Sequence, residues 1–146
     1  MSKDTVEIIL AKLQRLDEYL RYLKDLSKIR RALFIQDYHI YGLAERYLQL
    51  SIEIVLDIAK LLIIELNLPR PENNHESLAL LHKHRILTLR LYKRMLGMPG
   101  FRNILVHDYM KIDREIVHLN MCSGLKDFAD FRKAVIKKLK RPSRRN

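Results

Sequence analysis

The residues best suited to chemistry lie in one short stretch, Phe101 to Tyr109. Asn103 and His107 are four positions apart, so on a helix the amide could hold the imidazole in one orientation. Arg102 and Tyr109 are seven apart and follow nearly the same line of a helix. An imidazole exchanges protons near neutral pH, and a guanidinium binds phosphate oxygens through its planar fork. The stretch therefore points to chemistry on an anion, although an ordinary bundle helix with a buried arginine and a core histidine shows the same spacing.

Other histidines and the single cysteine do not form a comparable cluster. His75, His82 and His84 lie close in sequence, but positions 82 and 84 point about 200° apart on a helix, and the cysteine is distant. We expect surface histidines, no metal site and no cofactor. Cys122 has no second cysteine to pair with, and its apolar surroundings predict a packing residue.

Positive charge is concentrated in the second half of the chain. Residues 1–81 hold 11 basic and 12 acidic side chains, whereas residues 82–146 hold 17 basic and 5 acidic ones, a net charge of +12. Such asymmetry favours an anionic partner, with nucleic acid first and an acidic protein second. Residues 141–146 are expected to be a mobile basic tail, which either contacts phosphates or simply ends the last helix in solvent.

Elements that position this stretch are expected to be helices only. The 146 residues, of which 48% are hydrophobic and 31% charged, suit one domain, and no run alternates as a strand would. We predict an all-α, up-and-down bundle of four to five helices over residues 1–140. The most apolar stretch, residues 52–66, carries four charged side chains, so we expect no membrane span and a cytoplasmic protein.

Helix boundaries follow from apolar periodicity and from caps. The prolines at 69 and 71 mark a break, and residues 97–100 are expected to end one segment and redirect the chain. The predicted helical segments are 3–27, about 37–66, about 76–84, 89–96, 101 to about 109, and a final helix that follows a cap at Asp113 and ends near residue 140.

The apolar trio at positions 104–106 steps around the helix axis and cannot face one core, which favours a second contact surface, such as another copy of the chain. The segment Met98 to Asp113 resembles the signature of the HepT-like toxins of the HEPN ribonuclease superfamily. That signature is Arg-x4-His-x-Tyr, after Gly-Phe and before Ile-Asp, and every element of it is present here.

The resemblance implies an all-α homodimer that brings two motif helices face to face. It also implies a metal-independent endoribonuclease acting on tRNA or mRNA, as the toxin of a type VII toxin–antitoxin system. The implied antitoxin is an MntA-type nucleotidyltransferase, which uses ATP and silences the toxin by AMPylation of the motif tyrosine. By position, Arg102 and His107 would be catalytic, Asn103 would support the active site, and Tyr109 would be modified.

Two other functions are compatible with these residues. The chain could be a non-catalytic helical subunit that binds substrate or RNA for a nucleotidyltransferase, with Arg102 as a phosphate clamp. It could also be a basic RNA-binding bundle without chemistry. Replacing His107 distinguishes catalysis from binding.

Overall fold

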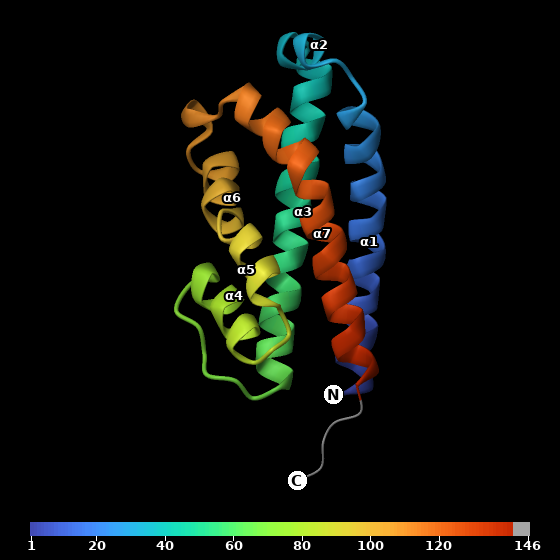
Figure 1. The fold of residues 1–146 in the computed structure, drawn as a ribbon, viewed down its shortest axis with the longest axis vertical. Coiled ribbons are helices and arrows are strands. Elements are labelled where there is room, and N and C mark those ends of the chain that lie inside the picture. Colours follow the sequence, from blue (N-terminus) through green and yellow to red (C-terminus); the bar gives the residue numbers. More distant parts are fainter. Residues whose placement is uncertain (142–146) are drawn as a thin grey trace.

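The computed structural model describes residues 1–141, so the predicted basic tail lies outside the described residues apart from Arg141. Three long helices form the body of the molecule: α1 (Lys3–Ser27), α3 (Tyr38–Glu65) and α7 (Arg114–Lys140). They pack against one another along their lengths, with α3 between α1 and the shorter helices (Figure 1). The described residues contain no strand, so the predicted all-α bundle is confirmed.

The shorter elements cover the side of α3 away from α1. These are α4 (Asn74–Lys83), α5 (Leu89–Met95), α6 (Met98–Val106) and the 3-10 turn η1 (Tyr109–Lys111), while α2 (Arg31–Gln36) closes one end of the bundle (Figure 1). Within residues 1–141, the helices all lack an apolar stretch of the length needed to cross a membrane.

Side-chain caps explain why several boundaries follow the sequence closely. The Ser2 hydroxyl accepts a hydrogen bond from the Thr5 amide at the start of α1, and the Thr88 hydroxyl accepts one from the Leu91 amide at the start of α5. Asp113 caps α7 as predicted, since its carboxylate accepts from the amides two and three residues later. Each cap satisfies an amide that the first helical turn leaves without a partner.

Residues 1–141 form seven α-helices, more than the predicted four to five, and one of them, α2, matches no predicted segment. α2 has six residues, too few to show a helical period, and its anchor in the core is Phe34, which is fully buried. Its end coincides with Asp37, whose carboxylate accepts from the His39 amide and so starts α3.

The helix that carries the motif differs from the prediction at both ends. It begins at Met98 rather than Phe101, because Gly97 is the N-cap residue and Pro99 lies in the first turn, where a missing amide proton costs nothing. It ends at Val106, and His107 is its C-cap residue. Tyr109 lies in the separate turn η1, so the predicted helical alignment of Tyr109 with Arg102 is wrong.

The core joins all three long helices. Leu13 and Leu16 from α1, Ile58 from α3, and Phe128 and Phe131 from α7 are at most 2% exposed. α6 packs chiefly on α3, through a short apolar edge that includes Leu105. The motif helix is therefore supported by the body of the bundle while its polar residues stay at the surface.

Candidate active site

The guanidinium of Arg102 is held across the gap between α6 and α3. Its Nη2 lies 3.3 Å from Oε1 of Glu53, and its Nη1 donates to the amide oxygen of Asn103 at 3.4 Å. Gln49, one turn before Glu53 on α3, donates to the same carboxylate oxygen at 3.3 Å. The Arg102 side chain is 26% exposed, so part of its hydrogen-bonding fork remains open to solvent.

Asn103 does not orient the imidazole as the four-residue spacing suggested. Its side-chain oxygen accepts from Arg102, and only its backbone carbonyl bonds to His107, accepting from that amide at 2.8 Å. The same carbonyl also accepts from the Asp108 amide at 3.3 Å, because the helix ends here and its last carbonyls are shared. The Asn103 side chain therefore contacts Arg102 and not the His107 imidazole.

His107 and Tyr109 lie at the exposed end of the motif segment. The His107 imidazole forms no side-chain hydrogen bond with any residue among 1–141, and it is open to solvent. Tyr109 is 69% exposed, and the next residue, Met110, is 87% exposed. The structure therefore brings Arg102 and Asn103 into contact, and it leaves the imidazole and the phenol accessible from outside.

A groove runs from Arg102 over α3 towards the start of α4. It consists of two adjoining hollows of about 320 Å³ each, which share Lys60 and Asn74. We call it the Lys60 groove. The first hollow is lined by Glu53, Leu56, Asp57, Lys60, Asn74 and Arg102, and the second by Lys60, Pro71, Glu72, Asn73, Asn74, His75, Ser77, Pro99 and Asn103.

Sequence reasoning missed Glu53, Lys60 and Asn74, which lie far from the motif along the chain. An acidic residue on an otherwise apolar helix was the available signal for Glu53, but its partner could not be read from spacing, since Arg102 is 49 positions away. The consecutive motif residues Arg102 and Asn103 border the first and second hollow respectively.

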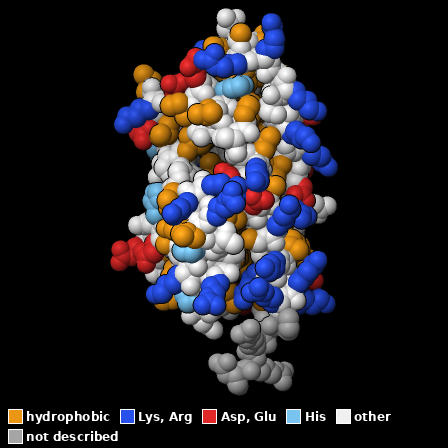
Figure 2. Space-filling view, viewed as in Figure 1, with side chains coloured by type: hydrophobic (Ala, Val, Ile, Leu, Met, Phe, Trp, Pro, Cys, Tyr) orange, Lys and Arg blue, Asp and Glu red, His pale blue; other side chains and the backbone are white. Residues whose placement is uncertain are grey.

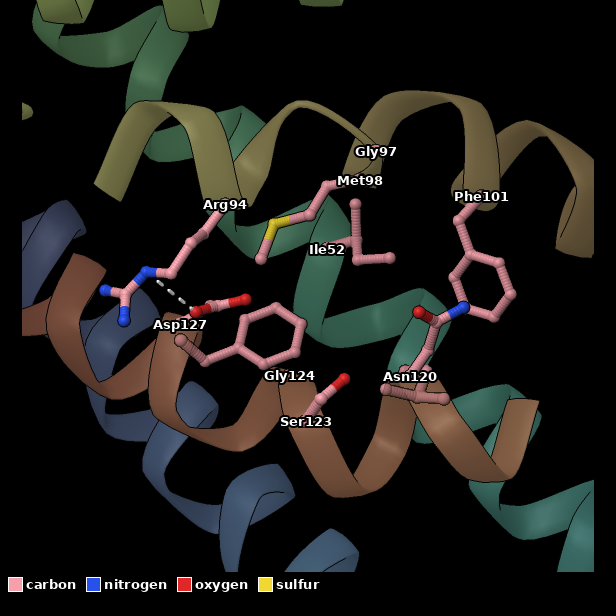
Figure 3. A pocket seen from close by; sticks show the side chains of 11 residues that line it. Ile52, Arg94, Gly97, Met98, Phe101, Asn120, Ser123, Gly124 and Asp127 are labelled. Carbon is pink, nitrogen blue, oxygen red and sulfur yellow. Dashed lines mark ion pairs between the residues drawn. The ribbon is translucent and has the colours of Figure 1, made fainter. Parts of the chain in front are cut away.

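A second cavity, of about 280 Å³, lies between α7 and the α5–α6 segment, with α3 as its floor (Figure 3). Phe101 and Asn120 border one end, and the ion pair of Arg94 with Asp127, 3.3 Å apart, borders the other. Burial raises the pKa of the Asp127 carboxyl despite the nearby guanidinium. Arg94 also donates to Asp130 at 2.6 Å, so this cluster ties α5 to α7. None of the four predicted site residues borders the cavity.

Residues 1–141 contain no group of three or more His, Cys, Asp or Glu side chains placed to hold a metal ion. His82 has a structural role: its Nδ1 lies 3.1 Å from the Leu87 carbonyl, and its ring stacks on Tyr92 at 5.0 Å.

Cys122 is exposed, so its prediction as a packing residue is wrong. Partial burial nevertheless raises the pKa of its thiol, which keeps it protonated and a poor nucleophile at neutral pH.

The molecular surface is rich in cations. Figure 2 shows Lys and Arg side chains spread over one face, with a concentration towards the end of the bundle that holds both chain termini. The last turn of α7 contributes Lys137, Lys138 and Lys140. A surface of this kind attracts polyanions at long range.

Comparison with known proteins gives a consistent result. A family model described as Ribonuclease HepT-like matches residues 16–135. The chain is 30% identical over 121 residues to the tRNA nuclease HepT of Aphanizomenon flos-aquae, covering 83% of this chain and 82% of that protein. It is 32% identical over 98 residues to the mRNA nuclease HepT of Shewanella oneidensis, covering 67% and 74% of the two chains.

Solved structures agree. A toxin–antitoxin crystal structure with AMP-PNP contains a chain that superimposes with a TM-score of 0.83 at 25% identity, covering 90% of this chain and 98% of that one. The tri-AMPylated HEPN toxin of Shewanella oneidensis, in complex with its MNT antitoxin, also gives a TM-score of 0.83, at 26% identity over 94% of this chain and 99% of that one.

Proposed function

The chain belongs to the Ribonuclease HepT-like family, and from that premise we propose that it is the endoribonuclease toxin of a type VII toxin–antitoxin pair. We place its action in the cytoplasm, on tRNA or mRNA, the substrates named for its two relatives. The observation that carries the proposal is the motif segment, where the Arg102 guanidinium, held by Glu53, lies in the middle of α6 and the exposed His107 imidazole follows at the C-cap of the same helix.

The chemistry that this pair supports needs no metal. RNA carries its own nucleophile, the 2′-hydroxyl. His107 takes the proton of that hydroxyl while the oxygen attacks the adjacent phosphorus, and the 5′-oxygen leaves. The products are a 2′,3′-cyclic phosphate and a 5′-hydroxyl, whose proton comes from an imidazolium; in a homodimer, the second copy of the chain supplies it. Arg102 stabilises the negative charge that grows on the phosphate oxygens.

Silencing acts through Tyr109 in this proposal. An MntA-type nucleotidyltransferase transfers AMP from ATP to the phenol oxygen and releases pyrophosphate, as the AMPylated toxin among the structural relatives suggests. The high exposure of Tyr109 supports access by such an enzyme. The AMP group on Tyr109 is bulky and negatively charged. It therefore obstructs the binding of RNA and competes with the RNA phosphates for the Arg102 guanidinium.

The decisive experiment compares the wild type with His107→Ala on purified tRNA and on total RNA, in the presence of a chelator. We expect the wild type to cut RNA and leave 5′-hydroxyl ends, and the variant to cut roughly 10²–10⁴-fold more slowly while still binding RNA. His84→Ala is the matched control, since His84 is an exposed C-cap histidine at the end of α4.

Equal cleavage and equal growth arrest by wild type and His107→Ala would refute the catalytic proposal. That result would favour the non-catalytic subunit, in which Arg102 clamps a phosphate and the partner performs the chemistry. A wild type that cuts only after metal is added would refute the metal-independent mechanism alone.

A further inference from the structure

The Lys60 groove contains a lysine that forms no ion pair with any residue among 1–141. In the first hollow, Glu53 is paired with Arg102, and Asp57 is paired with Lys12 at 3.3 Å. Lys60 is exposed and has no carboxylate within ion-pair distance among the described residues. The end of the groove nearest Arg102 therefore presents an unpaired ammonium and a partly exposed guanidinium to a phosphodiester, while the carboxylates of Glu53 and Asp57 on the same lining are each held in an ion pair.

The other end of the groove has a different chemical character. Its polar lining is mainly uncharged, with the side chains of Asn74, His75 and Asn103 available, whereas Ser77 is buried and bonded to a carbonyl of the preceding turn. Glu72 also lines this hollow, and its negative charge disfavours a second phosphate there. Amide and imidazole groups are those that hydrogen-bond to exposed base edges in single-stranded RNA.

We propose that the Lys60 groove binds the nucleotide next to the scissile phosphate, with Lys60 on its phosphate and with Asn74 and His75 on its base. This inference rests on the proposed function, because Arg102 fixes where the scissile phosphate lies. It makes the groove a determinant of substrate preference: Lys60 contributes affinity that is independent of sequence, and the α4 residues favour certain bases at one position beside the cut.

The affinity test measures RNA binding in the non-cleaving His107→Ala background, by fluorescence anisotropy with a labelled single-stranded RNA over a range of salt concentrations. Adding Lys60→Gln is expected to weaken binding about fivefold and to reduce the slope of log K against log salt by about 1. Lys83→Gln, at the far end of α4, removes the same charge outside the groove and serves as control. Thermal unfolding of each variant confirms that it is folded.

The specificity test uses otherwise wild-type protein. Cleavage sites in total RNA are mapped by sequencing 5′-hydroxyl ends, for the wild type and for the double variant Asn74→Ala, His75→Ala. We expect the double variant to lose a base preference at one position beside the cut. It should also raise KM for a short RNA more than it lowers kcat.

The outcomes separate the two proposals. If the wild type cuts RNA but Lys60→Gln matches Lys83→Gln and the mapped sites are unchanged, the groove proposal is overturned and the ribonuclease stands. If the wild type does not cut RNA but Lys60→Gln selectively weakens binding, the groove stands as an RNA-binding site and the ribonuclease falls. Absence of any RNA binding overturns both.

Discussion

Arg102 of α6 and Glu53 of α3 form an ion pair, with 3.3 Å between Nη2 and Oε1, and their side chains are 26% and 33% exposed. An ion pair this accessible to water stabilises the fold by about 0–1 kcal/mol, so a substrate phosphate can take over the guanidinium at little cost. Glu53 therefore has two opposed effects in the proposed enzyme. It holds the guanidinium in place, and its negative charge opposes an incoming phosphate.

Two substitutions separate these effects. Glu53→Gln keeps an oxygen for the guanidinium but removes the charge, so we expect KM for a short RNA to fall about fivefold, given about 1 kcal/mol for two charges 4 Å apart in water. Glu53→Ala removes the oxygen as well, so the arginine loses its positioning contact and kcat falls. Steady-state kinetics on a labelled RNA measure both.

The control for Glu53→Gln is Asp25→Asn, which removes a carboxylate from an exposed i,i+3 ion pair with Lys28, the C-cap residue of α1. It should leave both kinetic constants unchanged. An increase of KM in Glu53→Gln would mean that the carboxylate assists phosphate binding and would contradict this account.

Tyr109→Phe tests the proposed modification. The substitution removes only the phenol oxygen of a side chain that is 69% exposed, so we expect normal RNA cleavage that the nucleotidyltransferase and ATP no longer suppress. Tyr38→Phe is the matched control, since Tyr38 is 67% exposed and lies outside the motif. Mass spectrometry should show AMP on the wild type and on Tyr38→Phe; AMP transfer with loss of activity in Tyr109→Phe would exclude Tyr109 as the acceptor.

Asp130→Asn tests how acid affects the bundle. The hydrogen bond from Arg94 holds the pKa of Asp130 below its usual value of 3.8. The folded state consequently binds this proton less readily than the unfolded state, so the contribution of Asp130 is complete above pH 3.8 and disappears as pH falls through the folded-state pKa. We expect the variant to lose up to about 1 kcal/mol of unfolding free energy at pH 7.

Urea unfolding of the wild type and of Asp130→Asn at a series of pH values measures this difference, which should shrink towards zero in strong acid. Asp127 provides the contrast, because burial raises the pKa of its carboxyl. Its ionisation costs stability as pH rises, so its contribution to the pH dependence has the opposite sign. A constant gap between wild type and Asp130→Asn at every pH would refute the role given to Arg94.

Ser51→Ala should stabilise the protein. Ser51 is fully buried on α3, and its hydroxyl oxygen has no hydrogen-bond partner among the described residues. Removing an unsatisfied buried polar group is expected to raise the free energy of unfolding by about 1 kcal/mol, measured by urea denaturation. Ser77→Ala is the control: its hydroxyl is also in a fully buried residue but donates to the Asn73 carbonyl at 3.3 Å, so that variant should not gain stability.

The long helices could be predicted because periodicity and caps agree there. The boundaries of α1 coincide with the predicted 3–27, since Ser2 caps a helix with a continuous apolar stripe. The sequence pattern did not predict the structure where an element is very short, or where a residue type occurs both in breaks and in first helical turns. α2 is too short to show a period, and Pro99, interpreted as part of a break, belongs to the first turn of α6.

The assignment of the candidate site to Arg102, Asn103, His107 and Tyr109 stays a prediction from the motif, and its geometry could be predicted only in part. A helical wheel assumes a continuous helix, whereas α6 ends at Val106. The partner of the arginine is Glu53, which packing of α6 on α3 supplies from 49 positions away. Contacts of this kind depend on tertiary packing, which spacing along the chain does not encode.

Because α6 ends at Val106, the motif residues lie on two separate structural elements. Arg102 is carried by a helix braced on the core, whereas Tyr109 stands on a separate three-residue turn that faces outward. A modifying enzyme could bind this turn and modify the Tyr109 phenol without displacing the Arg102 guanidinium from its position on α6. Control of such a toxin would then require no unwinding of its fold, and the silenced and active forms would share one scaffold.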